Sequence, residues 1–134
     1  MDFYENAVDV HEAAEILNKN GKHRMSVYNS CLAIELYLKS RLPLVENAAS
    51  FEMSHDVVNI YRTLNKRSTS KKNLTRIVTL SRKYFNESRY PSSGTKMFTN
   101  ELAAEFLEYV SEIKDYVDNQ CIADINDLKN RYKK

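Results

Sequence analysis

Residues 22–43 read KHRMSVYNSCLAIELYLKSRLP. Apolar residues recur in this stretch at spacings of three and four, the period of an α-helix: Val27, Cys31, Ile34 and Leu38. Three more apolar residues widen the surface: Tyr28, Leu32 and Leu36. A surface this broad is typical of the central helix of a bundle, which neighbouring helices contact on several sides. Because Pro43 cannot continue a helix, we expect the central helix to end at Leu42.

The segments on either side of this stretch also have helical periodicity. Gly21 ends the preceding segment, since glycine tolerates the left-handed conformation that follows many helix ends. The chain has only two glycines and two prolines, whereas all-β folds use both freely in tight turns. We therefore expect an all-α, up-and-down antiparallel bundle of about five helices, with Ser54 as the N-cap of the third. The expected helices lie near residues 4–19, 22–42, 54–65, 71–88 and 98–119.

Length and composition favour one soluble, intracellular domain. A chain of 134 residues fits a single domain over residues 1–134, and its 43% apolar and 28% charged residues are an ordinary globular balance. The first fifteen residues contain five acids and no Lys or Arg, unlike a signal peptide. No uncharged stretch is long enough to span a membrane. We expect a cytoplasmic protein without a membrane segment, in which Cys31 and Cys121 are free thiols.

The net charge of +2 is unevenly distributed along the chain. Residues 57–86 contain eight basic residues and no acid, whereas residues 98–127 contain eight acids and the single base Lys114. Neighbouring helices of opposite charge would account for this pattern. The alternative is a basic face that binds phosphate groups. Complementary surfaces also suit two copies of the chain, so we expect a homodimer.

The sequence offers little support for a metal or cofactor site. The Glu-x-x-His spacing of Glu52 and His55 occurs once, whereas a di-iron bundle needs it on two helices. With two glycines in the whole chain, there is no Gly-rich phosphate loop. We therefore expect no metal and no cofactor.

Three groups of polar residues lie where a purely structural bundle does not need them. Glu35 and Lys39 are four residues apart on the central helix, in the order that favours an ion pair. Residues 54–56 (SHD) open the third helix, and residues 89–91 (RYP) end the fourth. Each group also has a structural interpretation: a surface ion pair, a histidine in a capping turn, and a helix-end cation beside a packed ring.

In series, these groups resemble the HEPN (higher eukaryotes and prokaryotes nucleotide-binding) domain, over roughly residues 3–120. The resemblance implies a helical bundle, frequent dimers, and binding of nucleotides or RNA. It also implies a link to ribonucleases, toxins among them, which are often encoded with a nucleotidyltransferase partner. Those nucleases carry an Arg and a His with four to six residues between them, and no His of this sequence has an Arg at that distance before it.

Three functions are compatible with this resemblance and with the missing motif. The first, which we favour, is a non-catalytic domain that binds a nucleotide or an RNA phosphate. The second is a protein-interaction module that partners a nucleotidyltransferase or a similar protein. The third is a divergent ribonuclease that pairs Arg89 with His55 across helices.

The first function predicts one site at one end of the bundle. The expected ligand-binding residues are Lys39, His55, Arg89 and Tyr90. They converge if the second and fourth helices run parallel and end where the third begins. Arg89 and Lys39 would then bind phosphate, and Tyr90 would stack on a base.

Overall fold

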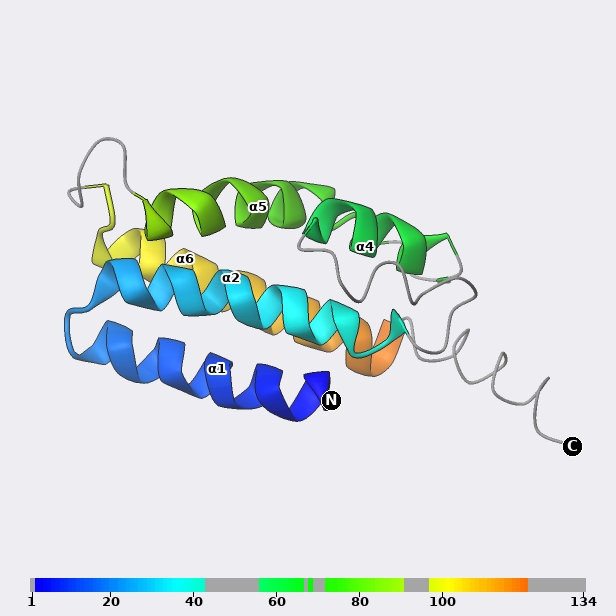
Figure 1. Cartoon of the computed structure of the whole chain (residues 1–134), viewed down its shortest axis with the longest axis horizontal. Helices are drawn as coiled ribbons and strands as arrows, with labels where there is room; N and C mark the ends of the chain where they lie inside the picture. The colour runs from blue at the N-terminus through cyan, green and yellow to red at the C-terminus, as the bar shows by residue number, and fades with distance from the viewer. Residues whose placement is uncertain (1, 43–55, 67, 69–71, 91–96, 121–134) are drawn as a thin grey trace, which may run out of the picture.

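The computed structural model describes residues 2–42, 56–66, 68, 72–90 and 97–120, arranged as Figure 1 shows. Its elements are α1 (Phe3–Lys19), α2 (His23–Lys39), α4 (Val57–Asn65), α5 (Thr75–Arg89), α6 (Asn100–Asp115) and a π-helical turn (Tyr116–Gln120). Within these ranges there is no β-strand, which confirms the expected all-α class. None of the described helices is long and apolar enough to cross a membrane.

α2 is the central helix, as its broad apolar surface predicts. Ten of its 17 residues are buried, more than one contact face could cover. The helix packs against α1, α4, α5 and α6. Figure 1 shows α1 on one side of α2, α5 on the other, and α6 behind it. The helix ends at Lys39 instead of Leu42, because residues 40–42 form a turn.

α4 begins later than the sequence suggested. Its first residue is Val57 and its N-cap is Asp56, whose carboxylate accepts a hydrogen bond from the backbone N–H of Asn59 at 3.4 Å. A carboxylate in this position also faces the positive end of the helix dipole. Asp56 therefore caps the helix in place of the expected Ser54, which lies outside the described residues.

A tight turn at Gly21 joins α1 to α2. Gly21 has a φ angle of 75°, in the left-handed region. The backbone N–H of Lys22 donates to the carbonyl of Leu17 at 2.8 Å, which closes the end of α1. The expected glycine stop is thus confirmed.

Gly21→Ala is expected to lower the free energy of unfolding by about 1 kcal/mol. The space beside Gly21 is open, so the loss comes from the left-handed backbone and not from a clash. Urea denaturation measures the change. Gly21→Asn is the control, because Asn tolerates this conformation better and should lose less. An alanine variant as stable as the native chain would contradict this origin.

α1, α2, α5 and α6 alternate in direction, whereas α4 runs in the same direction as α2 (Figure 1). Nη1 of Arg24, at the start of α2, donates to the carbonyl of Ser88, at the end of α5, at 2.6 Å. The second and fourth expected helices are therefore antiparallel, and the expected parallel arrangement is wrong. α4 lies between them in the chain: Val57 lines a cavity together with Glu35, one turn before the end of α2, and the Asn65 side chain accepts a hydrogen bond from Tyr116 in the π-helical turn. α5 then runs back along α2.

Aromatic rings join α5 to α6. The ring of Tyr84 lies edge-on to the rings of Phe98 and Phe106, with centroid distances of 6.5 and 5.3 Å. Phe106 is almost fully buried. Such pairs stabilise a core beyond the area they bury. They fix the buried face of α5, so that its opposite face is turned to solvent.

Candidate nucleic-acid interface

The solvent-facing side of α5 is strongly basic. The helix buries Ile77, Val78, Ser81 and Ser88. Its exposed residues include four cations, which we call the basic face of α5: Arg76, Arg82, Lys83 and Arg89. The one acid of the helix, Glu87, is partly buried. A cationic face of this kind attracts phosphate groups.

Among the described residues, Lys83 and Arg89 have neither a carboxylate partner nor a side-chain hydrogen bond. Nη1 of Arg82 lies 3.5 Å from Oδ1 of Asp56, but the two side chains are 54% and 36% exposed. Solvent screens such a pair, so Arg82 stays available to a ligand. Arg76 donates to the hydroxyl of Tyr109 at 3.0 Å.

An exposed tyrosine follows the basic face. Tyr90 is the C-cap of α5, and it is 68% exposed. The guanidinium carbon of Arg89 lies 5.3 Å from the centroid of the Tyr90 ring and 5.5 Å from that of Phe85. A nucleic-acid base can stack on such an exposed ring, and the neighbouring cation can bind the phosphate of the same nucleotide.

Opposite charge on neighbouring helices explains part of the basic block. Nζ of Lys72 lies 3.6 Å from Oε1 of Glu112 on α6. The hydroxyl that binds Arg76 donates in turn to Glu105 of α6. The bases at the start of α5 therefore meet the acidic helix, as the charge pattern suggested. Those of its C-terminal half face solvent.

The Glu35–Lys39 pair is buried, and not the surface pair that its structural interpretation assumed. Nζ of Lys39 lies 3.3 Å from Oε2 of Glu35, and both side chains are 5% exposed. The same nitrogen is 5.9 Å from the centroid of the Phe3 ring on α1. The pair is therefore largely shielded from bulk solvent.

The structure separates Lys39 from Arg89 and Tyr90. Arg24 contacts the residue before Arg89, and Lys39 is fifteen residues further along α2. That interval spans about 22 Å along a helix axis. His55 lies outside the described residues. The expected residues therefore do not share one end of the bundle, and their binding roles stay predictions.

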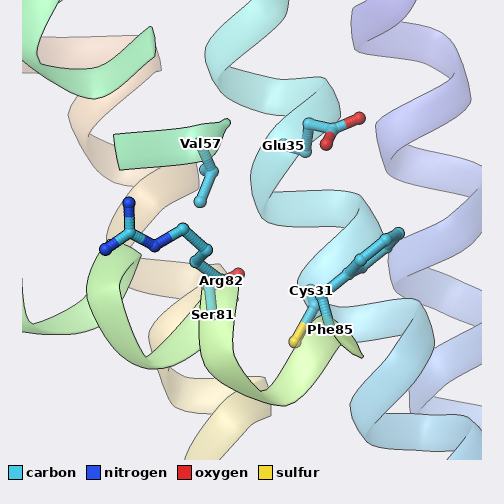
Figure 2. A pocket seen from close by; sticks show the side chains of 6 residues that line it. All are labelled: Cys31, Glu35, Val57, Ser81, Arg82 and Phe85. Carbon is cyan, nitrogen blue, oxygen red and sulfur yellow. The ribbon is translucent and has the colours of Figure 1, made fainter. Parts of the chain in front are cut away.

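A cavity of about 110 Å³ lies between α2, α4 and α5, as Figure 2 shows. It is lined by Cys31, Glu35, Val57, Ser81, Arg82 and Phe85. The cavity brings Glu35 together with the start of α4, directly after residues 54–56. Arg82 thus takes the position expected of Arg89. Arg82 could have been found from the sequence, because it precedes Arg89 by seven residues and so lies two turns away on the same side of the helix.

Cys31 is not suited to nucleophilic chemistry in this cavity. Its side chain is 1% exposed, and burial raises the pKa of the thiol to about 12, against a smaller opposing effect of the hydrogen bond with Ser81. The thiol therefore stays protonated at neutral pH, whereas the thiolate is the reactive form. Cys31 is a free thiol, as expected, and Cys121 lies outside the described residues.

His11 is partly buried and has a lowered pKa. Its Nδ1 lies 3.2 Å from the hydroxyl of Tyr37, and burial lowers the pKa of the imidazole. It lies on α1, away from the basic face of α5. In the part of the chain that the structure describes, no three His, Cys, Asp or Glu side chains are grouped to hold a metal ion.

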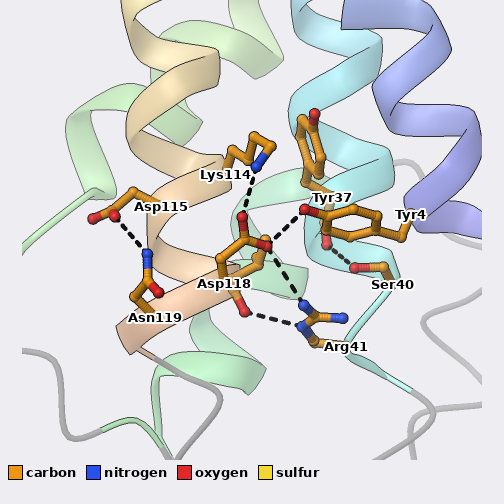
Figure 3. A network of polar contacts seen from close by, with 9 residues as sticks. Tyr4, Tyr37, Ser40, Arg41, Lys114, Asp115, Asp118 and Asn119 are labelled. Carbon is orange, nitrogen blue, oxygen red and sulfur yellow. Dashed lines mark hydrogen bonds and ion pairs between the residues drawn. The ribbon is translucent and has the colours of Figure 1, made fainter.

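A second polar cluster closes the end of the bundle where α1 begins (Figure 3). Asp118, in the π-helical turn, accepts hydrogen bonds from the Tyr4 hydroxyl at 2.8 Å and from Nζ of Lys114 at 2.7 Å. Nη2 of Arg41 lies 3.6 Å from the same carboxylate, and its Nε donates to the carbonyl of Val117 at 3.0 Å. Because these polar groups bind one another, we assign the cluster a structural role, which is to hold α1, α2 and α6 together at this end of the bundle.

The chain is thus an all-α bundle with a buried Glu–Lys pair on its central helix α2 and a basic helix α5. The chain belongs to the HEPN domain family, whose family model, described as HEPN domain, matches residues 1–120. The resemblance seen in the sequence is thereby confirmed. No curated protein and no solved structure matches the chain significantly.

Proposed function

We propose that this HEPN domain binds RNA, without cleaving it, through the C-terminal half of α5. The observation that carries the proposal is the pair at its end: Tyr90 is 68% exposed, and the Arg89 guanidinium lies 5.3 Å from its ring centroid. Arg82 and Lys83 extend the same cationic surface toward α4. Phosphates would bind the cations, and one base would stack on Tyr90.

The length of this surface favours a strand over a mononucleotide. Arg82 and Arg89 are seven residues apart, about 10 Å along the axis of α5. That separation exceeds the size of one phosphate group, so the two arginines would bind different phosphates. A free nucleotide would use the Arg89 and Tyr90 end alone and bind more weakly.

Lys39 and His55 have separate places in the proposal. The Lys39 ammonium is buried and pairs with Glu35, so its proposed role is to stabilise the fold and not to bind the ligand directly. His55 directly precedes Asp56, whose carboxylate lies beside Arg82. We therefore propose His55 as an additional contact near Arg82.

Arg89→Ala is expected to weaken binding of a fluorescein-labelled single-stranded RNA about tenfold and to lower the slope of log Kd against log salt by about one. Fluorescence anisotropy over a series of salt concentrations measures both. Tyr90→Ala is expected to lose about tenfold through lost stacking, with little change in the salt slope. Both side chains are exposed, so the thermal midpoint should not move.

Arg62→Ala is the matched control, because Arg62 is an exposed base on α4, outside the basic face of α5. It should bind RNA as the native chain does. Equal losses in all three variants would indicate charge attraction without a site, and no binding by the native chain would overturn the proposal. ATP in place of RNA tests the mononucleotide, and a gel of the incubated RNA tests the ribonuclease alternative.

The interaction-module function is the second candidate, because Ile16 on α1 and Met25 on α2 are apolar side chains that are 59% and 37% exposed. A nucleotidyltransferase is one proposed partner of this kind. A second copy of the chain is the other proposed partner.

A further inference from the structure

The end of α5 is attached to α2 at two positions. Nη1 of Arg24 donates to the carbonyl of Ser88 at 2.6 Å. The ring of Tyr28 stacks on the ring of Phe85, with a centroid distance of 5.3 Å and an interplanar angle of 24°. Arg24 and Tyr28 are four residues apart, so they lie on the same side of α2. Both contacts therefore hold the last turns of α5, which end in Arg89.

Phe85 connects this attachment to the basic face of α5. The guanidinium carbon of Arg89 lies over the Phe85 ring, 5.5 Å from its centroid, and over the Tyr90 ring at 5.3 Å. A cation over an aromatic ring is attracted by the electrons of the ring face. This contact uses none of the N–H donors in the guanidinium plane, so they remain available to a phosphate.

The Phe85 ring is the firmer of the two supports of Arg89. Among the described residues, Arg89 has neither a carboxylate partner nor a side-chain hydrogen bond, so aromatic contacts orient it. Tyr90 is 68% exposed and its ring lies in solvent. Phe85 is partly buried against α2.

The position of the Phe85 ring depends in turn on Tyr28. Phe85 lines the cavity of about 110 Å³ between α2, α4 and α5 (Figure 2), so its ring lacks packing contacts on that side. The stacked ring of Tyr28 supplies a contact that the cavity does not. In the described part of the chain the Tyr28 hydroxyl has no hydrogen-bond partner, so the ring alone makes this contact. Without it, Phe85 has room to turn into the cavity and away from Arg89.

We propose that Tyr28 is a positioning residue of the RNA site, which holds the Arg89 guanidinium in place through Phe85 without touching RNA. The inference rests on the proposed binding of RNA by the end of α5, and it adds a residue of α2 to that site. A side chain that is already held in place loses less conformational entropy when its ligand binds. The aromatic contacts therefore increase the affinity of Arg89 for a phosphate.

Tyr28→Leu is expected to weaken binding of the labelled single-stranded RNA about fivefold and to lower the slope of log Kd against log salt. Leucine keeps an apolar side chain but has no ring face. Because Tyr28 is uncharged, it can change the salt slope only through a cation. A loss of affinity with an unchanged slope would show that Tyr28 stacks on a base itself, and it would overturn the positioning role. Tyr28→Phe keeps the ring and should bind as the native chain does.

The double variant Tyr28→Leu, Arg89→Ala tests whether the effect passes through Arg89. It should bind RNA as Arg89→Ala alone does, whereas additive losses would overturn the inference. If Arg89→Ala weakens binding and Tyr28→Leu does not, the inference fails and the proposed RNA site stands. If the native chain does not bind RNA, both fail.

Nuclear magnetic resonance of the arginine side chains tests the positioning without RNA. In the native chain, the heteronuclear NOE of the Arg89 Nε–H group should exceed that of Arg62, an exposed base on α4. In Tyr28→Leu the Arg89 value should fall to that of Arg62, while the thermal midpoint changes little. Equal values for the two arginines in the native chain would show that the rings do not hold Arg89, and they would overturn the inference whatever the outcome with RNA.

Discussion

Replacing Lys39 by Met is expected to lower the free energy of unfolding by about 3–5 kcal/mol. The Lys39 ammonium lies 3.3 Å from the Glu35 carboxylate, and each side chain is 5% exposed. Met fills a similar volume, so the loss would not come from a cavity. It would come from the loss of the Lys39 charge beside the buried Glu35 carboxylate. Urea denaturation followed by circular dichroism measures the change.

Lys72→Met is the matched control for this prediction. Lys72 pairs with Glu112 at 3.6 Å, but the two side chains are 46% and 42% exposed, so the loss should be below about 1 kcal/mol. The double variant Glu35→Gln, Lys39→Met removes both charges and should recover most of the stability. Equal losses of stability from Lys39→Met and Lys72→Met would contradict the prediction that burial makes the Glu35–Lys39 pair costlier to break than an exposed pair.

The helices could be predicted because helical periodicity is a local property of the sequence. The apolar positions of α2 are spaced for a helix, and its buried face follows from them. The turn at Gly21 could also be predicted, because the left-handed backbone that it needs is favoured by this one residue. Helix starts were less well placed, because Asp56 and Ser54 are both good N-caps and only packing selects between them.

Helix direction could not be predicted in the same way. It depends on where α4 packs, and α4 begins with Val57 at a cavity lined by Cys31 and Glu35 and runs in the same direction as α2. Nothing local in the sequence encodes that position. The same nonlocal packing buries Lys39, because the ring of Phe3 from α1 lies near its ammonium.

Only part of the candidate surface could be predicted from the sequence. The end of α5 carries Arg89 and the exposed Tyr90, as the sequence suggested. Arg82 was missed because the sequence does not show which of the bases between residues 57 and 86 meet the acidic α6. Lys72 does so, and Arg82 lies beside the start of α4.

Raising the pH from 9 to 12 is expected to destabilise the fold by several kcal/mol through two buried acids. Burial raises the pKa of the Cys31 thiol from 9.0 to about 12 and that of the Tyr37 hydroxyl from 10.0 to about 12. Both side chains are almost fully buried. Above these ordinary values the unfolded chain has released the protons that the folded chain still holds, so stability falls as the pH rises. For Cys31, the difference between a pKa of 9.0 and one of about 12 corresponds to about 4 kcal/mol.

Thermal unfolding midpoints measured from pH 7 to 11 test this prediction. Cys31→Ser should flatten the decline that begins near pH 9, because a serine hydroxyl does not ionise there. Tyr37→Phe should flatten the decline only above pH 10. The hydrogen bond to Asp118 raises the pKa of Lys114, so the stability that this pair contributes is also lost at high pH. The native chain and each variant are therefore compared with one another over the same pH range. A Cys31→Ser variant that declines as steeply as the native chain between pH 9 and 10 would show that the thiol ionises freely in the fold, against its burial between α2 and α5.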